Sequence, residues 1–335
     1  MAEITMNHPR VSFVMPACNV EKYIVEAVES VLAQTVPFHE LIIIDDGSTD
    51  GTAEVLTPFL KDSRIRLVKS QKCSGGAYVP RRQAIMMASG EFIAPLDADD
   101  AVPRDYLERL LADIGRTGAD IVYPTMCDFA IGRHIAPTDE SFYRKAFEGR
   151  ECVKYTLDSW RVGCNGGLIR RSVYLGAFER YVPDVIHSQS DELLTRHLLL
   201  HARRVAFSPV PYLYRDNPDS ITKRISFKLF DFLINDKDLL ELIVREYGED
   251  SSECLMARRQ IFHGFFRAGF LLNSYSYSAR EKDEVRRRIA AGAELMDWNR
   301  IRGKVSPRYY FLLKHFPVQV AAAVVDAART LMGKF

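Results

Sequence analysis

The fold is decided by the stretch LIIIDDGSTDG, residues 41–51. Its apolar, mostly β-branched run enters a turn rich in Asp, Gly and Ser, which is the pattern of a buried strand that ends at residue 44. Outward from this stretch, short apolar runs alternate with helix-length amphipathic segments. The expected strands are 11–15, 41–44, 65–68, 92–96 and 121–123. The alternation predicts an α/β fold on a parallel sheet.

Ligands of such sheets bind beyond the carboxyl ends of the strands. Three of the four residues 97–100 are Asp, and like charges this close repel unless a cation is present. Oxygen ligands suit Mg²⁺ or Mn²⁺, which proteins hold with one or two carboxylates and the phosphates of a substrate. Because the chain has no phosphate-binding glycine loop of a standard kind, we expect the metal to hold a diphosphate ligand. Ser48 and Asp50, in contrast, are better explained as helix-capping residues.

The remaining chain falls into two parts by pattern. Residues 124–225 lose the regular alternation, and we expect them to complete the sheet, with a helix at 191–201 and strands near Val205 and Tyr212. From Ser226 onward, apolar residues recur at helical spacing. We therefore predict a sheet domain over residues 1–225 and a helical C-terminal region over residues 226–335.

Composition restricts the class of protein. A length of 335 residues suits about two domains, and 47% hydrophobic with 27% charged residues is typical of a globular protein. The net charge of +1 provides no field that would attract nucleic acid, so no such partner is expected. The charge is uneven, because residues 280–335 carry twelve Lys and Arg against six Asp and Glu.

This basic tail leaves two interpretations open. With the apolar segment 316–332 it either rests on an anionic membrane surface or forms a packing or homo-oligomer interface. A spanning helix is not expected, since Gln319, Asp326 and Arg329 interrupt the segment. Residues 1–10 lack the apolar core of a secretory signal, and the six cysteines show neither a CxxC pair nor zinc spacing. We expect a cytoplasmic protein with reduced thiols, at most peripheral on the inner face of the membrane.

Four segments together resemble a known enzyme family. They are VSFVMPACN at 11–19, DDGSTDG at 45–51, SGG at 74–76 with Arg81, and LDADD at 96–100. In this order and spacing they resemble the inverting glycosyltransferases of family 2, which have a GT-A fold, and a weaker likeness continues through residues 215–221. The shorter segment AYVPR is similar to teichoic-acid N-acetylglucosaminyl transferases. The resemblance implies a mixed, mainly parallel sheet flanked by helices, with the helical region as an appendage.

The resemblance also implies residues that bind a nucleotide-sugar donor. By position these are Pro16, Ala17, Asn19, Asp46, Arg81, Asp97 and Ala98. Asp46 would accept a hydrogen bond from the uracil base, and the planar fork of Arg81 would match phosphate or Asp. Asp99 would bind the Mn²⁺ or Mg²⁺, together with Asn217, which stands where many relatives carry His. Cys18 stands where many relatives carry an aromatic residue.

On the acceptor side, the resemblance points to an acidic pair that opens a helix. The pair here is Asp191-Glu192, the reverse of the usual Glu-Asp order. We expect Glu192 to be the general base, with Asp191 as the alternative, because neighbours on a helix point about 100° apart and only one can face the acceptor. Trp160 and Asn165 fall in the segment that resembles the acceptor side, although Trp160 is equally well explained as a core residue.

Together these features predict an inverting, metal-dependent glycosyltransferase. It would transfer a sugar from a UDP-sugar, for example UDP-GlcNAc, to a hydroxyl of a cell-envelope or capsular glycan, free or lipid-linked. Two alternatives belong to other classes. A nucleotidyltransferase would carry a glycine-rich loop with Lys after the first strand, where this chain has PACN at 16–19. A non-catalytic sugar-nucleotide-binding protein would form no product.

Overall fold

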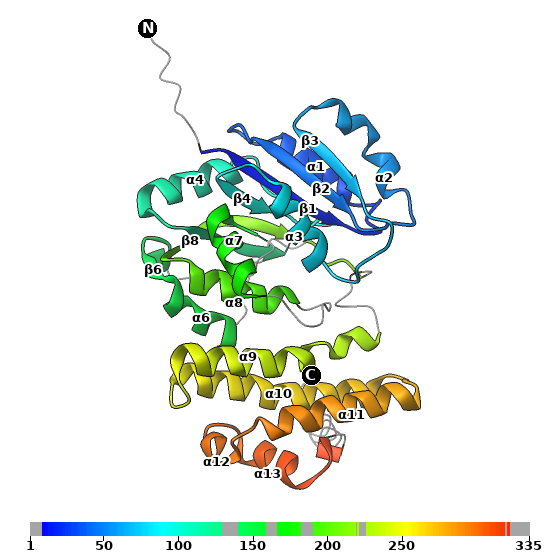
Figure 1. The fold of residues 1–335 in the computed structure, drawn as a ribbon, viewed down its shortest axis with the longest axis vertical. Coiled ribbons are helices and arrows are strands. Elements are labelled where there is room, and N and C mark those ends of the chain that lie inside the picture. The colour runs from blue at the N-terminus through cyan, green and yellow to red at the C-terminus, as the bar shows by residue number, and fades with distance from the viewer. Residues whose placement is uncertain are drawn as a thin grey trace. The chain divides into compact units, whose positions relative to one another are not determined.

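The computed structural model describes residues 9–128, 140–158, 166–181, 190–218, 220, 226–318 and 320–321. Contacts divide the chain into two compact units, Met1–Pro218 and Asp219–Phe335 (Figure 1). The first unit thus ends at Pro218, whereas the sequence pattern places a boundary after residue 225.

The first unit is built on one mixed sheet of eight strands among the described residues. Their order in space is β3-β2-β1-β4-β7-β5-β8-β6. The strands are β1 (Val11–Ala17), β2 (Glu40–Asp45), β3 (Ile65–Lys69), β4 (Phe92–Pro95), β5 (Ile121–Asp128), β6 (Ala146–Glu148), β7 (Leu168–Arg170) and β8 (Arg204–Tyr214). All pairings are parallel except those that involve β6 and β7. The predicted mixed, mainly parallel sheet is therefore confirmed.

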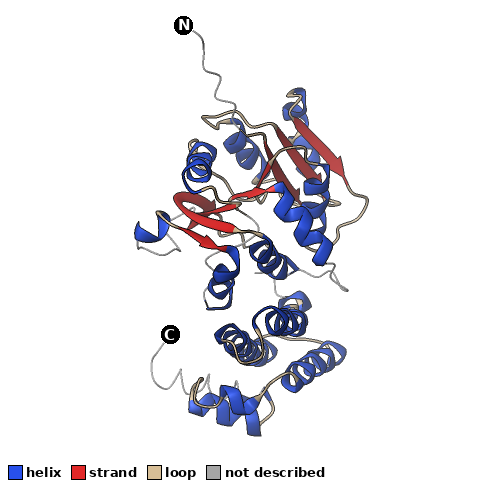
Figure 2. Ribbon diagram, turned by 60° about the vertical axis from the view of Figure 1, so that its left-hand side comes forward, coloured by secondary structure: helices blue, strands red, loops and turns tan. Residues whose placement is uncertain are grey.

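Helices cover the sheet on both sides (Figure 2). They are α1 (Ile24–Leu32), α2 (Thr52–Val55), the 3₁₀ helix η1 (Thr57–Lys61), α3 (Tyr78–Met87), α4 (Tyr106–Thr117), α5 (Glu140–Tyr143), α6 (Gly149–Asp158), α7 (Arg171–Arg180) and α8 (Ser190–His201). Every residue of β1 and β2 is buried, as expected of parallel strands with both faces covered.

Periodic apolar residues explain the helices that pack on the sheet. α1 buries Ile24, Ala27, Val28 and Val31, and α4 buries Leu107, Leu110 and Ile114, the stripes that the sequence predicts. α4 ends at Gly118, whose left-handed φ of 62° permits its N–H to bond the carbonyl of Ile114 at 2.8 Å. Truncation of the fully buried Phe13 of β1 to Ala would cost about 3–5 kcal/mol, so this core fixes the strand ends firmly.

The structure corrects one detail of the predicted strands. The two strands expected near Val205 and Tyr212 are a single strand, β8, which pairs with β5 through residues 205–207 and 211–214. The register shifts between Tyr123 and Thr125. Such an irregularity bends a strand and increases its twist. The apolar pattern of residues 204–214 is interrupted at the same place, and for this reason the sequence suggested two strands.

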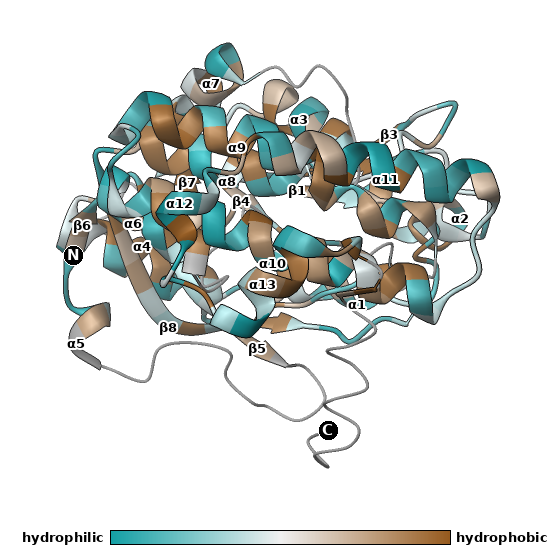
Figure 3. Cartoon of the chain, turned by 90° about the horizontal axis from the view of Figure 1, so that it is seen from below, coloured by the Kyte–Doolittle hydropathy of each residue, from teal (hydrophilic) through white to brown (hydrophobic). Residues whose placement is uncertain are grey.

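The second unit is helical throughout its described residues. Its elements are the 3₁₀ helix η2 (Phe227–Phe230), α9 (Phe232–Tyr247), α10 (Ser252–Ser274), α11 (Ala279–Glu294), α12 (Trp298–Ile301) and α13 (Pro307–His315). Figure 3 shows brown and teal bands on these helices, as amphipathic helices display. Ser278 and Glu281 form a capping box at the start of α11, which satisfies backbone N–H groups there.

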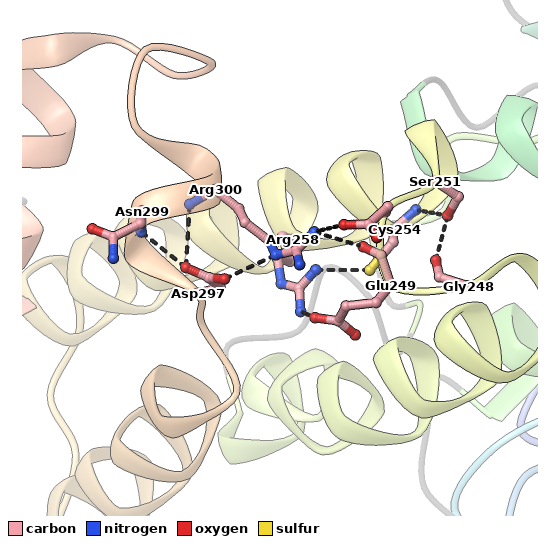
Figure 4. Close-up of polar contacts among 9 residues, drawn as sticks. Gly248, Glu249, Ser251, Cys254, Arg258, Asp297, Asn299 and Arg300 are labelled. Carbon is pink, nitrogen blue, oxygen red and sulfur yellow. Dashed lines mark hydrogen bonds and ion pairs between the residues drawn. The ribbon is translucent and has the colours of Figure 1, made fainter.

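A polar cluster links α10 and α12 within this unit (Figure 4). Arg258, which is buried, donates to Cys254 Sγ at 2.8 Å and pairs with Glu249. Arg300 pairs with Asp297 at 2.9 Å and with Asp250. These contacts tie the turn before α10 to α12. Among the described helices of the chain, none has the length and hydropathy that crossing a bilayer requires.

Candidate active site

The carboxyl ends of β1 and β2 are joined by side-chain hydrogen bonds. Asn19, whose φ is 55°, accepts from the Thr49 N–H at 2.8 Å, and its own N–H donates to Ser48 Oγ at 2.9 Å. Asp45 Oδ1 accepts from the Ser48 N–H at 3.0 Å. Asp50 accepts from the N–H of Thr52, the first residue of α2, at 3.1 Å, but the N-cap of this helix is Gly51, so the capping predicted for Ser48 and Asp50 is not observed. Asn19 therefore shapes this sheet edge and leaves its backbone near the expected donor.

Asp46 fixes a third loop at the same edge. Its Oδ2 accepts from the N–H of Ser74 at 2.8 Å and from Ser74 Oγ at 2.7 Å. Gly47 makes this approach feasible, because its φ is +69° and a Cβ there would lie 2.6 Å from the Cys73 nitrogen. The loops after β1, β2 and β3 thus meet at Asp46. Cys18 and Cys73 are part of this junction, with their sulfurs 3.3 Å apart.

The Asp97–Asp100 segment directly follows β4, and its three carboxylates have different partners. Asp97 Oδ1 accepts from Arg81 at 2.7 Å. Asp99 Oδ2 accepts from Asn217 Nδ2 at 2.9 Å. Asp100 is buried, and its oxygens accept from the Tyr212 hydroxyl at 2.8 Å and the Arg215 N–H at 2.8 Å. Asp100 thus has a structural role, whereas Asp97 and Asp99 line the strand end.

The three neighbouring carboxyl groups of this segment disfavour one another's ionisation. Burial, reinforced by the charges of Asp97 and Asp99, raises the pKa of the Asp100 carboxyl to about 8. Hydrogen bonds from Arg215 and Tyr212 oppose this rise. A cation near Asp99 would relieve the repulsion, as the sequence predicts.

Arg81 connects the strand ends with a distant helix. This side chain of α3 is only 1% exposed, and its guanidinium pairs with Asp97 Oδ1 at 2.7 Å and with Asp191 Oδ2 at 2.5 Å. Because both partners are carboxylates on different elements, the fork of Arg81 sets the position of α8 relative to the end of β4. Because Arg81 is buried, these are not ion pairs of an exposed surface side chain.

The two acidic residues at the start of α8 point in different directions. Asp191 contacts Arg81 and so lies beside the Asp97 carboxylate. Glu192 lies 3.8 Å from Arg196, one turn further along the same helix, and Arg196 in turn donates to Thr156 Oγ1 at 3.1 Å. Asp191, rather than Glu192, is therefore the residue that the fold brings to the Asp97–Asp99 edge.

Five of the predicted site residues remain to be located in the structure. Pro16, Ala17 and Ala98 are buried at the ends of β1 and β4. Trp160 and Asn165 lie outside the described residues. Sequence reasoning missed Tyr212 and Arg215, which hold Asp100 in place. His197 is buried and stacks on Tyr181, with ring centroids 4.8 Å apart.

The residues at this edge fit a metal that keeps few protein ligands. Across the described residues, no three His, Cys, Asp or Glu side chains are close enough to enclose an ion. Asp99 has a carboxylate here, and Asn217 touches it through its amide NH2 group, so Asn217 would have to turn its amide to present an oxygen to an ion. Mg²⁺ commonly accepts such a partial set when substrate phosphates complete its coordination.

Comparisons with known proteins identify the family. Residues 12–175 match the model of glycosyl transferase family 2. The putative teichuronic acid biosynthesis glycosyltransferase TuaG of Bacillus subtilis (strain 168) is 44% identical over 167 residues, which are 49% of this chain and 63% of TuaG. Glycosyltransferase GlyG of Streptococcus pneumoniae serotype 4 is 27% identical over 74% of this chain and 81% of its own length. Residues 12–175 therefore form a domain of glycosyltransferase family 2, and the chain is a glycosyltransferase.

Solved structures agree with the fold. The crystal structure of Staphylococcus aureus TarS 1-349 in complex with UDP-GlcNAc superposes with a TM-score of 0.72 at 20% identity, over 97% of this chain and 93% of that chain. The mannosyltransferase PcManGT of Pyrobaculum calidifontis, in complex with GDP-Man and Mn²⁺, superposes with a TM-score of 0.51 at 17% identity. The superposition covers 98% of this chain and 89% of PcManGT. The predicted GT-A fold is therefore confirmed.

Proposed function

We propose that this glycosyltransferase transfers a sugar from a UDP-sugar to a hydroxyl of a cell-envelope glycan, with inversion at the anomeric carbon. The observation that carries the proposal is the buried Arg81, which joins Asp97 at the strand end to Asp191 on α8. The contact supports the proposal because Asp97 follows a strand end, where the donor would bind, and Asp191 opens the helix whose acidic pair would face the acceptor.

The donor class is supported by the relatives and by the sheet edge. Poly(ribitol-phosphate) beta-N-acetylglucosaminyltransferase TarS is 26% identical to this chain over 239 residues, 69% of this chain and 39% of TarS, and its structure was solved with UDP-GlcNAc. In this chain, Asp46 and the backbone at Pro16 and Ala17 would contact the uracil base. The Asp97 carboxylate would contact hydroxyls of the ribose or the sugar.

Asp191 is the proposed general base, in preference to Glu192, because Glu192 faces Arg196. The acceptor O–H gives its proton to the Asp191 carboxylate, which retains acceptor capacity beside Arg81. The acceptor oxygen then bonds to the anomeric carbon. The bond from that carbon to the diphosphate oxygen breaks, and UDP leaves with the electron pair. Attack from the face opposite the leaving group inverts the configuration.

Asp99 and Asn217 are the proposed holders of Mn²⁺ or Mg²⁺. When bound, such an ion neutralises charge on the diphosphate. Arg81 and Asp191 do not depend on it, since they are already positioned by protein contacts.

The basic C-terminal region supports a further proposal on location, namely peripheral contact with an anionic membrane that holds the acceptor. In its described part, Phe311 and Phe316 are exposed and Lys314 lies between them in sequence. Flotation with anionic vesicles at low salt should recover the protein, whereas neutral vesicles should not. No recovery with either vesicle would favour the packing or homo-oligomer interpretation, which analytical ultracentrifugation would then measure.

The transfer itself is tested by incubation with UDP-GlcNAc, UDP-glucose and GDP-mannose in separate reactions with a poly(ribitol-phosphate) acceptor and Mn²⁺. We expect product from a UDP-sugar, with an inverted anomer by NMR. Asp191→Asn should form almost none, and Glu192→Gln should remain active. A retained anomer, or product from GDP-mannose alone, would contradict the proposal.

A further inference from the structure

Two thiols lie in contact at the edge of the sheet where the donor base is proposed to bind. Cys18 follows the last residue of β1, and Cys73 stands in the loop between β3 and α3. Their sulfurs are 3.3 Å apart although 55 positions separate them in sequence. A disulfide S–S bond is about 2.0 Å long, so a movement of little more than about 1 Å would join them.

We propose that Cys18 and Cys73 are a modification site, oxidised to a disulfide by low-molecular-weight disulfides, and that this bond lowers the affinity of the enzyme for its nucleotide donor. The second part rests on the proposed function.

The two sulfurs differ in accessibility, which sets the order of the steps. Cys73 is exposed, whereas Cys18 is partly buried. Burial, together with the neighbouring Cys73 and the charges of Asp46 and Asp45, raises the pKa of the Cys18 thiol to about 12. Since the thiolate is the attacking species, Cys73 reacts with the oxidant first.

The reaction is a thiol–disulfide exchange. The Cys73 thiolate attacks one sulfur of an oxidant such as oxidised glutathione, whose S–S bond breaks and releases one thiolate with its electron pair. Cys18 then gives its proton to solvent, and its sulfur attacks Cys73 Sγ and displaces the second thiolate. Two cysteine thiols are oxidised, and one external disulfide is reduced to two thiols.

The surroundings explain why the bond would affect the donor. Ser74 is adjacent to Cys73. Its N–H and its hydroxyl both donate hydrogen bonds to Asp46 Oδ2, at 2.8 and 2.7 Å. On the other side, the Cys73 backbone already packs against Gly47, with no room even for a Cβ. Movement of Cys73 toward Cys18 must therefore shift Ser74 on Asp46, the carboxylate proposed to bind the base.

The test begins with chemistry that needs no ligand. The full chain is incubated with oxidised glutathione, and its peptides are mapped by mass spectrometry. We expect a linked Cys18–Cys73 peptide pair that dithiothreitol separates. Cys18→Ser should instead keep glutathione on Cys73, because the resolving thiol is absent. Cys127→Ser, which removes a buried thiol of β5, should behave like the parent protein. Glutathione that stays on Cys73 of the parent, or no reaction there, would overturn the proposal.

The second measurement is calorimetric titration with UDP before and after oxidation. We expect oxidation to raise the Kd at least about tenfold, dithiothreitol to restore it, and Cys73→Ser to show no response to oxidant. If reduced protein binds UDP and the linked protein binds it equally well, the effect on the donor is refuted while the proposed function stands. If reduced protein binds no UDP, the proposed function fails, and with it the effect on the donor, although the peptide map still decides whether the disulfide forms.

Discussion

Arg81 in the sheet unit and Arg258 in the helical unit are both almost fully buried, at 1% and 4% exposure, and both pair with carboxylates. Among the described residues, the polar partners of the Arg258 side chain are Cys254 on its own helix and Glu249 in the turn before it. Arg81 instead joins three elements, since its partners are Asp97 after β4 and Asp191 on α8. A buried cation therefore does not mark a site by itself. A site is indicated when segments that are distant in sequence converge on such a cation at the carboxyl ends of parallel strands.

The largest expected effect separates the two acidic residues of α8. Asp191→Asn should lower kcat by about 10²–10⁴-fold, as removal of a general base does. Glu192→Gln should stay within about threefold, because Glu192 faces Arg196 rather than Arg81. Steady-state kinetics on both variants give the answer, and a larger loss in Glu192→Gln would reverse the assignment.

The two arginines can be compared directly. Arg81→Met should lower the free energy of unfolding by about 3 kcal/mol, because two carboxylates then share a mostly buried space without their cation. Arg258→Met should cost about 1–2 kcal/mol, since Glu249 is 43% exposed and water screens it. Transfer should be lost only in Arg81→Met. Urea unfolding and a transfer assay on the same preparations measure both effects, and loss of transfer in Arg258→Met would undo the contrast.

Glycines offer a third comparison between the units. Gly47 and Gly303 both have positive φ, at +69° and +75°, but only at Gly47 does an added Cβ meet nearby atoms. Gly303→Ala should cost about 1 kcal/mol of strain, whereas Gly47→Ala should cost about 2–3 kcal/mol and weaken UDP binding. Equal melting temperatures for the two variants would show that the loops near Asp46 adjust freely.

The smallest expected effect concerns two glutamates with lowered pKa values. Burial tends to raise the pKa of Glu40, but hydrogen bonds from the Ser89 N–H and hydroxyl and from Ser12 outweigh it, and the pKa falls below 4.5. The stability that ionised Glu40 contributes is thus present above about pH 4.5 and is lost as pH falls through its lower, folded-state pKa. Glu40→Gln should cost about 1–2 kcal/mol at pH 7 and reduce the acid sensitivity.

Glu281 is the exposed counterpart in the helical unit, where bonds from Ser278 lower its pKa. Glu281→Gln should change the unfolding curve less than Glu40→Gln at every pH, because solvent already surrounds this carboxylate. Thermal unfolding between pH 3 and 7 compares the two, and an equal loss in both would contradict a special contribution from the buried group.

Much of the sheet could be predicted because its strands are short, apolar and β-branched. All five expected strands exist. β2 and β3 each extend beyond their apolar residues, because the polar residues Asp45 and Lys69 are still paired across the two strands. β6 and β7 have three residues each and join antiparallel to partners far away in sequence. Nothing local distinguishes such strands, so sequence pattern alone misses them.

The site was less predictable, for a similar reason. Carboxylates after β2 and β4 and the importance of Arg81 could be inferred, but their partners could not, because the Arg81–Asp191 contact spans 110 positions. One local feature of the sequence favours Asp191 over Glu192 as the residue that faces the site. Arg196 stands four residues after Glu192, a spacing at which opposite charges on a helix attract, and this favours Glu192 facing along its own helix.

The central claim is that the strand ends around Arg81 bind a UDP-sugar and a divalent metal. Calorimetric titration of the full chain with UDP-GlcNAc, in Mn²⁺ and again in EDTA, measures this most directly, with Arg81→Met and Asp99→Asn as comparisons. We expect the parent protein to bind UDP-GlcNAc more tightly in Mn²⁺ than in EDTA. Asp99→Asn should bind it equally in both, and Arg81→Met should bind it weakly. Equal binding in Mn²⁺ and EDTA, or unchanged affinity in both variants, would contradict it.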